Sequence, residues 1–332
     1  MASATLPSMT AARDYAIQTR GLSKRYGQVA ALTDLSLSVP DGSIYGFLGP
    51  NGAGKTTMIR MLLGFIRPSA GEARVLGHDS WHDGVAARAR LGYLVAGEAL
   101  YSDMNGTALL DFAADLSGRP PAMRRALLDA LELGEAALGR KLGTYSKGMR
   151  QKLALVAAMQ HDPQVLILDE PTDGLDPLIQ RNFEEVIRAI HARGRTVFMS
   201  SHDLPEVERL CQTVAIVRGG RLLTEATIAD LQRRHWRQAV VFLRDAPPLR
   251  LDAIPGVVSC RIEGNRVDLA IEGEIGPLLR GLASLDVVDL HLPPPRLEDI
   301  FLGFYGSDDP NSGSDRPGVE EPVRTEPSGA IR

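Results

Sequence analysis

The sequence predicts an α/β fold in which a large sheet domain, with an inserted helical subdomain, is followed by a small α+β domain. Apolar strands alternate with helical patterns between residues 17 and 234, as expected of an α/β sheet domain. A glycine-rich loop separates a strand from a helix within this region. Beyond residue 238 the spacing of the elements changes. A chain of 332 residues is long enough for both domains.

The glycine-rich loop reads Gly-Pro-Asn-Gly-Ala-Gly-Lys-Thr-Thr at residues 49–57 and fits the spacing Gly-x-x-x-x-Gly-Lys-[Ser/Thr]. Glycines let successive backbone N–H groups curl around a polyanion, because no Cβ blocks the approach. Residues 43–48 read as a buried strand, and residues 57–63 as a helix whose positive N-terminus faces the phosphates. A chance glycine-rich loop is the alternative, but the strand–loop–helix order favours a site for a nucleoside triphosphate.

Each residue type in this loop has an expected task. Lys55 would reach the β- and γ-phosphates, and the Thr56 hydroxyl would ligate Mg²⁺. The loop residues expected to bind the nucleotide are Gly49, Pro50, Asn51, Gly52, Ala53, Gly54, Lys55, Thr56 and Thr57.

A second motif, Val-Leu-Ile-Leu-Asp-Glu-Pro at 165–171, is an apolar strand that ends in two carboxylates. Asp169 at the strand end would hold Mg²⁺ through water. Glu170 would polarise the attacking water as a general base. Ordinary capping of the following helix is the alternative, and the phosphate-binding loop upstream favours the catalytic interpretation.

The remaining organisation follows from composition and periodicity. Residues 100–160 have Ala- and Leu-rich helical periodicity, which predicts the inserted helical subdomain. Residues 238–305 predict the order βαββαβ of a ferredoxin-like accessory domain, in which 248–254 is a short helix and 264–265 a turn. Residues 1–16 and 306–332 are expected to be a flexible leader and a disordered tail. All these ranges are read from the sequence.

Composition narrows the class of protein. The net charge of −4 gives no basic footprint for nucleic acid, although it excludes local basic patches only weakly. The apolar runs, such as 165–168, are far shorter than the ~18–20 residues of a membrane span. Residues 1–16 lack the pattern of a signal peptide. Cys211 and Cys260 stand alone, which favours packing roles in a reducing cytoplasm.

Four further segments resemble motifs of the ATP-binding cassette (ABC) family of ATPases, and the resemblance covers residues 17–230. Tyr-Ser-Lys-Gly-Met-Arg-Gln at 145–151 is similar to the signature segment and opens a helix predicted at 150–159. Gly-Leu-Asp-Pro at 174–177 resembles the D-loop, and Ser-Ser-His-Asp-Leu at 200–204 the switch-histidine segment. Lys-Arg-Tyr-Gly at 24–27 resembles the loop whose aromatic ring stacks on adenine.

The resemblance implies a P-loop ATPase that works as a head-to-tail pair, in which each site combines one subunit's phosphate loop with the other's signature segment. Ser146 and Gly148, at a helix N-terminus, would then face a γ-phosphate across the interface. His202 would contact that phosphate and align Glu170 with the water, whereas a lone histidine is more often structural. Asp176 would connect the two sites. Tyr26 would stack on adenine, the alternative being a core position.

Two segments depart from the family pattern. The signature has Tyr145, Lys147 and Met149 where the common form has Leu, Gly and Gln, a variant similar to that of export-type members. In the stretch 92–101 the family places a glutamine that touches Mg²⁺ and the membrane partner. The residue at that position is Ala96, with Glu98 nearby, so the metal contact and the coupling are open there.

The end of the second domain, Arg-Leu-Glu-Asp-Ile-Phe-Leu-Gly-Phe-Tyr at 296–305, resembles the closing helix of drug-exporter ATPases of the daunorubicin-resistance type. A plain amphipathic helix is the alternative. The resemblance implies a homodimeric ATP-hydrolysing subunit, with ATP and Mg²⁺, that docks on a separate membrane permease at the cytoplasmic face and powers export of a drug, antibiotic or other small hydrophobic compound. No nucleic-acid partner is expected.

Two other functions are compatible with the ATPase motifs. The first is an ABC ATPase acting on ribosomes or chromosomes, but such members usually carry tandem cassettes or a long coiled coil, and this chain has neither. The second is an importer ATPase with a regulatory C-terminal domain, which the short accessory region and its exporter-like ending disfavour.

Overall fold

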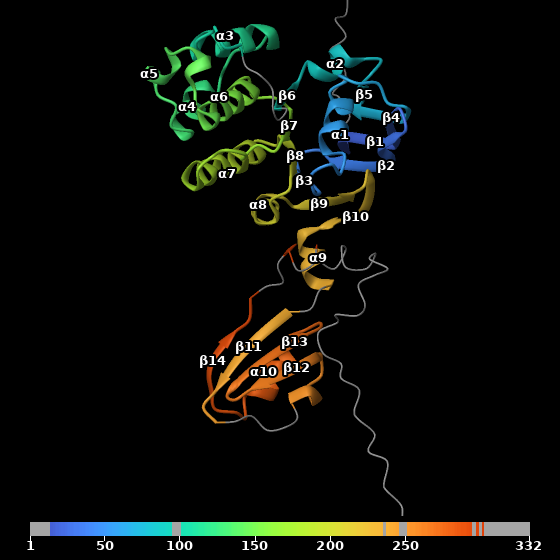
Figure 1. Ribbon diagram of the computed structural model, residues 1–332, viewed down its shortest axis with the longest axis vertical. Coiled ribbons are helices and arrows are strands. Elements are labelled where there is room, and N and C mark those ends of the chain that lie inside the picture. Colours follow the sequence, from blue (N-terminus) through green and yellow to red (C-terminus); the bar gives the residue numbers. More distant parts are fainter. Residues whose placement is uncertain are drawn as a thin grey trace, which may run out of the picture.

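A computed structural model of the chain describes residues 14–94, 101–234, 237–245, 251–293, 297, 298 and 301, with the side chains of 233 and 234 excepted. Figure 1 shows a larger amino-terminal domain and a smaller carboxy-terminal one, connected through the helix α9. Ala96 and Glu98 lie outside the described residues, as do most of the predicted leader, the predicted tail and most of the predicted closing helix.

The central element of the larger domain is a six-stranded sheet with the order β10-β9-β3-β8-β7-β6. All neighbouring strands in it are parallel except the antiparallel pair β9 and β10. Its strands are β3 (Ile44–Leu48), β6 (Leu91–Leu94), β7 (Val165–Asp169), β8 (Thr196–Ser201), β9 (Thr213–Arg218) and β10 (Arg221–Thr227). Because helices or strands cover both faces, β3, β7 and β8 are buried throughout, which explains their continuous apolar sequences.

A second sheet was not anticipated from the sequence. It is antiparallel, with the order β2-β1-β4-β5, and lies beside helix α1 in Figure 1. Its strands are β1 (Tyr15–Tyr26), β2 (Val29–Pro40), β4 (Ala70–Val75) and β5 (His78–Asp79). One apolar core joins this sheet, α1 (Lys55–Leu62) and the face of the main sheet that carries Tyr45, Phe47 and Phe198.

The helices between residues 100 and 160 form the helical subdomain at the upper left of Figure 1. They are α3 (Gly106–Ser117), α4 (Arg124–Ala130), α5 (Glu135–Leu138), a 3₁₀ turn at Leu142–Thr144 and α6 (Lys147–Met159). Helix α6 begins three residues before the predicted start at 150, because the Ser146 hydroxyl accepts a hydrogen bond from the Met149 amide at 3.2 Å and caps it there.

The second apolar core joins the opposite face of the main sheet to this subdomain and to the helices that follow β7 and β8. Residues such as Ile44, Leu166 and Met199 contribute to it, so the alternation along each strand supplies both cores. The remaining helices of the larger domain are α2 (Gly84–Arg88), α7 (Pro177–Ala192), α8 (Leu204–Leu210) and α9 (Ile228–Arg234).

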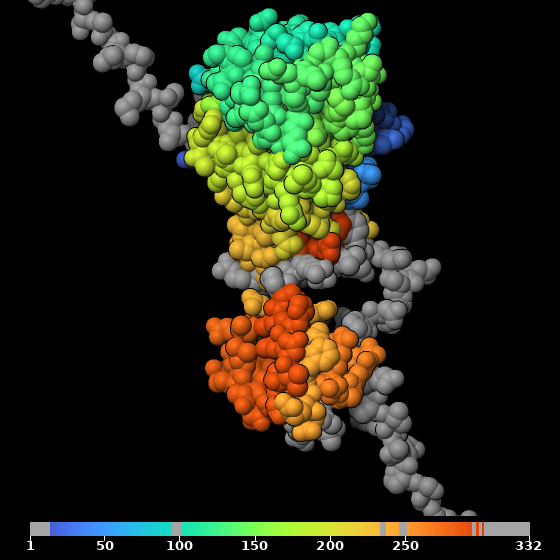
Figure 2. All heavy atoms as spheres, turned by 90° about the vertical axis from the view of Figure 1, so that its left-hand side faces the viewer, coloured from blue at the N-terminus to red at the C-terminus, as the bar shows by residue number. Residues whose placement is uncertain are grey.

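The smaller domain has one antiparallel sheet with the order β12-β13-β11-β14, and forms a separate lobe in Figure 2. Its elements are β11 (Arg237–Leu243), a 3₁₀ turn at Leu251–Ala253, β12 (Val257–Glu263), β13 (Arg266–Ile271), α10 (Gly276–Leu282) and β14 (Val287–His291). This order is that of a split βαβ, or ferredoxin-like, arrangement. Leu278 and Leu282 of α10 are buried against the sheet.

The short helix expected at 248–254 is reduced to a 3₁₀ turn over the residues that can be described. Only the 3₁₀ turn is present there, closed by the Ile254 amide on the Leu251 carbonyl at 3.3 Å. The turn cannot propagate because Pro255 follows Ile254 and disfavours helical backbone there. Gly256, at φ +91°, then turns the chain into β12.

The described part of the closing segment returns to the larger domain. Leu297 is fully buried in the second apolar core, and Phe301 packs against the same core. The Leu297 amide lies 3.5 Å from the Glu208 carboxylate of α8. The two domains are therefore connected through this contact as well as through α9.

Substitution of Phe198 tests the apolar core between the two sheets. It is fully buried, with its centroid 5.9 Å from that of Tyr45 and 5.6 Å from that of Phe47. We expect Phe198→Ala to destabilise the larger domain by about 3–5 kcal/mol, because the cavity cannot collapse between two sheets. Denaturant unfolding measures this change. Val85→Ala, at a position 81% exposed, is the control, expected to stay within about 0.5 kcal/mol; equal effects would contradict the assignment of this core.

Candidate nucleotide-binding site

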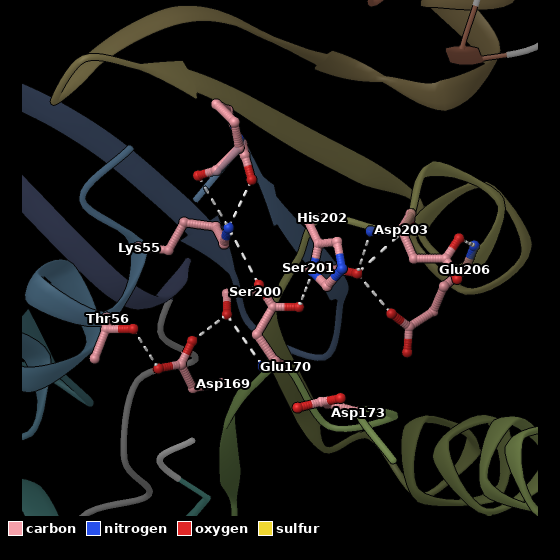
Figure 3. A network of polar contacts seen from close by, with 12 residues as sticks. Lys55, Thr56, Asp169, Glu170, Asp173, Ser200, Ser201, His202, Asp203 and Glu206 are labelled. Atoms are coloured by element: carbon pink, nitrogen blue, oxygen red, sulfur yellow. Dashed lines mark hydrogen bonds and ion pairs between the residues drawn. The ribbon is translucent and has the colours of Figure 1, made fainter. Parts of the chain in front are cut away.

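The candidate site lies at the edge of the main sheet where the parallel strands β3, β7 and β8 end. The glycine-rich loop follows β3, Asp169 and Glu170 close β7, and His202 follows β8. Because the carboxyl ends of parallel strands share one edge, three segments distant in sequence meet there. Figure 3 shows their side chains in one connected network of polar contacts.

The backbone of the loop requires glycine at two positions. Gly54 has φ +101°, and a Cβ on it would lie 2.6 Å from the Ala31 carbonyl oxygen. A Cβ on Gly49 would lie 2.6 Å from the Val217 carbonyl oxygen. The loop thus passes against β2 and β9 so closely that only glycine fits. It delivers the chain into α1, whose N-terminus begins at Lys55.

Lys55 is buried and its ammonium group points into the loop. Nζ donates to the Gly49 carbonyl at 2.6 Å and to the Pro50 carbonyl at 3.3 Å, and lies 3.1 Å from Glu170 Oε1. Burying this cation is tolerable because three oxygens surround it. A cleft of about 360 Å³ opens beside it, lined by Ala31, Pro50, Asn51, Gly52, Gly54, Lys55, Thr56, Thr57 and Glu170.

The side chains of Thr56 and Asp169 lie together and offer two oxygen atoms, the kind of donor that Mg²⁺ prefers. The Thr56 hydroxyl donates to Asp169 Oδ2 at 2.7 Å, and Ser200 Oγ donates to Asp169 Oδ1 at 2.5 Å. Mg²⁺ is usually held by one or two such protein oxygens together with substrate phosphates and water. A donor set of this small size fits that chemistry. No group of three or more His, Cys, Asp or Glu side chains within the described part of the chain forms an all-protein metal site.

Glu170 connects the loop to the segment after β8. Its Oε1 faces Lys55 at 3.1 Å, and its Oε2 lies 2.6 Å from His202 Nδ1. Its backbone has φ +50°, which is uncommon for a residue with a side chain. The Glu170 amide donates to the Ser200 carbonyl oxygen at 3.2 Å and so fixes this conformation. Strain of this kind is found where a side chain must be aimed.

His202 is exposed, with its side chain at 58% of the accessible maximum. Beside a carboxylate, Nδ1 acts as the donor, which leaves Nε2 directed elsewhere. Ser200 and Ser201, which precede it, end the buried strand β8. The histidine is therefore held at the edge of the cleft and is not a core residue.

The signature residues do not line this cleft. Ser146 and Asp176 are exposed, and each caps a helix: Ser146 caps α6, and Asp176 accepts from the Leu178 and Ile179 amides at 3.1 Å at the start of α7. A Cβ on Gly148 would lie 2.8 Å from the Gly174 carbonyl oxygen. Within the described residues, one chain thus brings together the loop, Asp169, Glu170 and His202, but not Ser146, Gly148 or Asp176.

Tyr26 also lies outside the residues that line the cleft. Its ring is 48% exposed and Lys24 Nζ is 5.1 Å from its centroid. The core alternative considered for this aromatic residue is therefore wrong. An exposed ring at the end of β1 remains available for stacking.

Several residues that connect the motifs were missed at the sequence level. Gln151 Nε2 donates to the carbonyls of Glu170 and Pro171 at 3.3 and 2.8 Å, and Lys147 Nζ pairs with Asp173 at 2.8 Å. They link α6 to the turn after β7. Gln151 is the last residue of the signature segment at 145–151, so the sequence marks its position but does not give its partners.

This fold and this site together define a P-loop ATPase. A family model described as "ABC transporter" matches residues 32–173. The daunorubicin resistance ATP-binding protein DrrA3 of Streptomyces coeruleorubidus is 35% identical over 89% of this chain and 97% of the relative. The daunorubicin/doxorubicin resistance ATP-binding protein of Streptomyces peucetius is 32% identical over 93% and 98%.

Two further comparisons cover the ATPase domain. The bacitracin transport ATP-binding protein of Bacillus licheniformis is 39% identical over 66% of this chain and 72% of the relative. A solved ATP-binding subunit of an ABC transporter superposes with a TM-score of 0.61 at 30% identity, covering 65% of this chain and 92% of that one. The chain belongs to the ATP-binding subunits of ABC transporters, and its enzymatic class is ATPase.

Substitution of Lys55 tests the phosphate-binding loop. We expect Lys55→Ala to weaken ATP affinity by about 10- to 100-fold, because one charge-assisted contact is worth about 1.5–3 kcal/mol. Isothermal titration calorimetry measures the change. Arg60→Ala, which removes an exposed cation from the same helix, should leave the affinity unchanged. Unchanged affinity in Lys55→Ala would contradict the loop assignment.

Proposed function

We propose that the chain powers a separate membrane permease that exports a small hydrophobic compound, of the drug or antibiotic class. The observation that carries this proposal is the extent of the similarity to the two daunorubicin resistance proteins, which spans the accessory domain as well as the ATPase domain. The similarity to the bacitracin transport protein covers a smaller share of the chain. The class of transported compound is inferred from the names of the relatives. Selectivity among such compounds is assigned to the permease.

The hydrolytic chemistry is assigned to side chains at the edge of the sheet. Glu170 is the general base for the attacking water, a role worth roughly 10²–10⁴-fold in rate. His202 orients Glu170 through the Nδ1–Oε2 hydrogen bond of 2.6 Å. Lys55 and the loop amides hold the phosphates, and Tyr26 stacks on adenine.

Thr56 and Asp169 are assigned as the ligands of Mg²⁺, whose charge, when bound, would neutralise the phosphate oxygens. Their hydrogen bond and the short Ser200 contact hold the Thr56 hydroxyl and the Asp169 carboxylate together at the ends of the strands. The position of Ala96 lies outside the described residues, so no ligand is assigned there.

Two copies of the chain are proposed to complete each site. Ser146, Gly148 and Asp176 do not line the cleft of their own chain, yet they lie at or before helix N-termini, where backbone N–H groups attract anions. In a head-to-tail pair they reach the partner's nucleotide. A solved bacterial ABC transporter cassette with 20% identity to this chain is itself described as dimeric.

Removal of the Glu170 charge tests the general base. Glu170→Gln keeps the shape of the side chain but cannot take the proton, so we expect ATP turnover to fall by about 10²-fold or more while ATP is still bound. Steady-state phosphate release and light scattering with ATP would show a slow enzyme that accumulates as a dimer. Glu185→Gln, at an exposed position of α7, is the control. Near-normal turnover of Glu170→Gln would exclude the role.

An apolar groove provides a candidate surface for the permease. It has a volume of about 450 Å³ and lies between the end of β6 and helices α3 and α6; Phe65, Tyr93 and Leu116 are among its lining residues. Leu116 is 73% exposed, and the Phe65 and Tyr93 rings meet edge to face at 5.4 Å. Leu94, the last described residue before the stretch in which the family is expected to contact its membrane partner, is one of the lining residues. Its apolar lining fits the apolar face of a permease loop helix.

The helices of the described residues include none that is long and apolar enough to cross a membrane. Because the proposed contact with the permease is apolar, a charge in the groove should separate the two subunits. We expect Leu116→Asp to abolish co-purification of a multi-span protein from detergent-solubilised membranes, with basal ATP turnover unchanged. Val288→Asp, at an exposed position of the accessory domain, is the control. Undiminished co-purification would remove the groove from the interface, and recovery of ribosomal or chromosomal proteins would favour the alternative function.

A further inference from the structure

Glu206 of helix α8 is a buried carboxylate next to the switch histidine. It is only 2% exposed, and its Oε2 accepts a hydrogen bond from Ser201 Oγ at 2.6 Å. Among the described residues no lysine, arginine or histidine forms an ion pair with it. Burying a carboxylate without a cation is costly, so this position needs an explanation beyond packing.

A second buried carboxylate in the same region shows the contrast. Glu184 of α7 is 6% exposed but lies 2.7 Å from Arg209 and 3.2 Å from Arg188. Its charge is neutralised by two guanidinium groups. The Glu206 carboxylate, one helix away, accepts a hydrogen bond from the Ser201 hydroxyl instead of pairing with a cation. The two side chains therefore form a natural pair for comparison.

The electrostatic surroundings of Glu206 favour its neutral form. Burial raises the pKa of its carboxyl to about 7, and the hydroxyls of Ser201 and Thr172 oppose this shift. The negative charges of Asp203 and Glu170 raise the pKa further, and the Cys211 thiol also faces it. Near neutral pH both protonation states are populated.

The hydrogen bonds of Glu206 involve Ser201 and Asp203, the residues on either side of His202 in the chain. Ser201 Oγ donates to Glu206 Oε2 and accepts from the Asp203 amide at 2.9 Å, while the Glu206 amide donates to Asp203 Oδ1 at 3.2 Å. This is a capping box in which the serine hydroxyl bridges the acidic side chain to the N-cap amide. His202 lies between the two bridged residues, as Figure 3 shows.

We propose that Glu206 is a positioning residue of the ATPase site, which holds the backbone of Ser201 and Asp203 so that His202 Nδ1 stays on Glu170 Oε2. The inference rests on the proposed role of His202. Without the carboxylate, the Ser201 hydroxyl loses its short acceptor and the chain on both sides of His202 is less constrained. Displacement of a catalytic group by about 1 Å can cost up to 10²-fold in rate.

The first test compares Glu206→Ala with Glu206→Gln in the full chain. We expect Glu206→Ala to lower kcat for ATP by about tenfold with KM nearly unchanged, because Lys55 and the loop bind the nucleotide independently. Glu206→Gln retains an oxygen acceptor for Ser201 and should recover most of kcat. A rise in KM that accompanies the fall in kcat would overturn the proposal. An equal fall in kcat in Glu206→Ala and Glu206→Gln would also overturn it.

The second test is a double-mutant cycle with His202→Ala. A residue that acts through His202 adds little once the imidazole is absent, so Glu206→Ala should change kcat by less than about twofold in that background. A further tenfold loss there would overturn the role of Glu206 alone. A silent His202→Ala together with a slow Glu206→Ala would instead overturn the proposed role of His202 and, with it, this inference.

Glu184→Ala is the matched control for a buried carboxylate. It should lower the unfolding temperature, since it leaves Arg209 and Arg188 without a partner, and its effect on kcat should be additive with His202→Ala.

Glu206→Gln should also change the pH dependence of stability. A carboxyl whose pKa is raised from 4.5 to about 7 on folding contributes stability that is lost as pH rises through 7. The difference in unfolding free energy between Glu206→Gln and the parent should therefore shift in favour of the variant when the pH is raised from 5 to 8. A shift in favour of the parent would contradict a buried carboxyl that ionises in this range.

Discussion

The geometry of the site depends on the placement of one carboxylate, that of Glu170, between the Lys55 ammonium at 3.1 Å and His202 Nδ1 at 2.6 Å. Three chain segments meet at this group. It is aimed by a backbone at φ +50° that is held on Ser200. A shift of any of the three segments would therefore move the base away from its partners, which explains why the strand ends around it are buried and heavily hydrogen-bonded.

The charged groups around Glu170 suit it to the binding of a metal ion and a phosphate. Among the described residues, Lys55 is the buried cation that pairs with Glu170, at 3.1 Å, whereas Asp169 is held by the hydroxyls of Thr56 and Ser200. Such a site is prepared to receive positive charge from a metal ion and to exchange the Lys55–Glu170 contact for one with phosphate. With the roles proposed for Lys55 and Glu170, nucleotide binding would be coupled to release of the Glu170 carboxylate through this one lysine. Glu206, a buried carboxyl without a cation, is proposed to stabilise the turn that carries His202.

The sequence predicted the parts of the fold that local patterns determine. Continuous apolar runs located β3 and β7, and glycine spacing located the loop before α1. The antiparallel sheet was missed because β1 and β2 pair with several register irregularities, which obscure strand alternation. Contacts such as Ser201–Glu206 and Gln151–Pro171 were missed because they require the tertiary arrangement. A longer helix was predicted where the structure has a 3₁₀ turn before Pro255, because hydrophobic periodicity alone does not show where a helix ends.

The decisive measurement is a structure of the full chain with Mg²⁺ and a non-hydrolysable ATP analogue. We expect Lys55 Nζ to leave Glu170 for the β- and γ-phosphates, while Glu170 Oε2 keeps its contact with His202 Nδ1. Thr56 and Asp169 should both lie in the coordination shell of the metal. A persistent Lys55–Glu170 ion pair, with the phosphates bound elsewhere or Glu170 turned away from His202, would exclude the proposed roles of these residues.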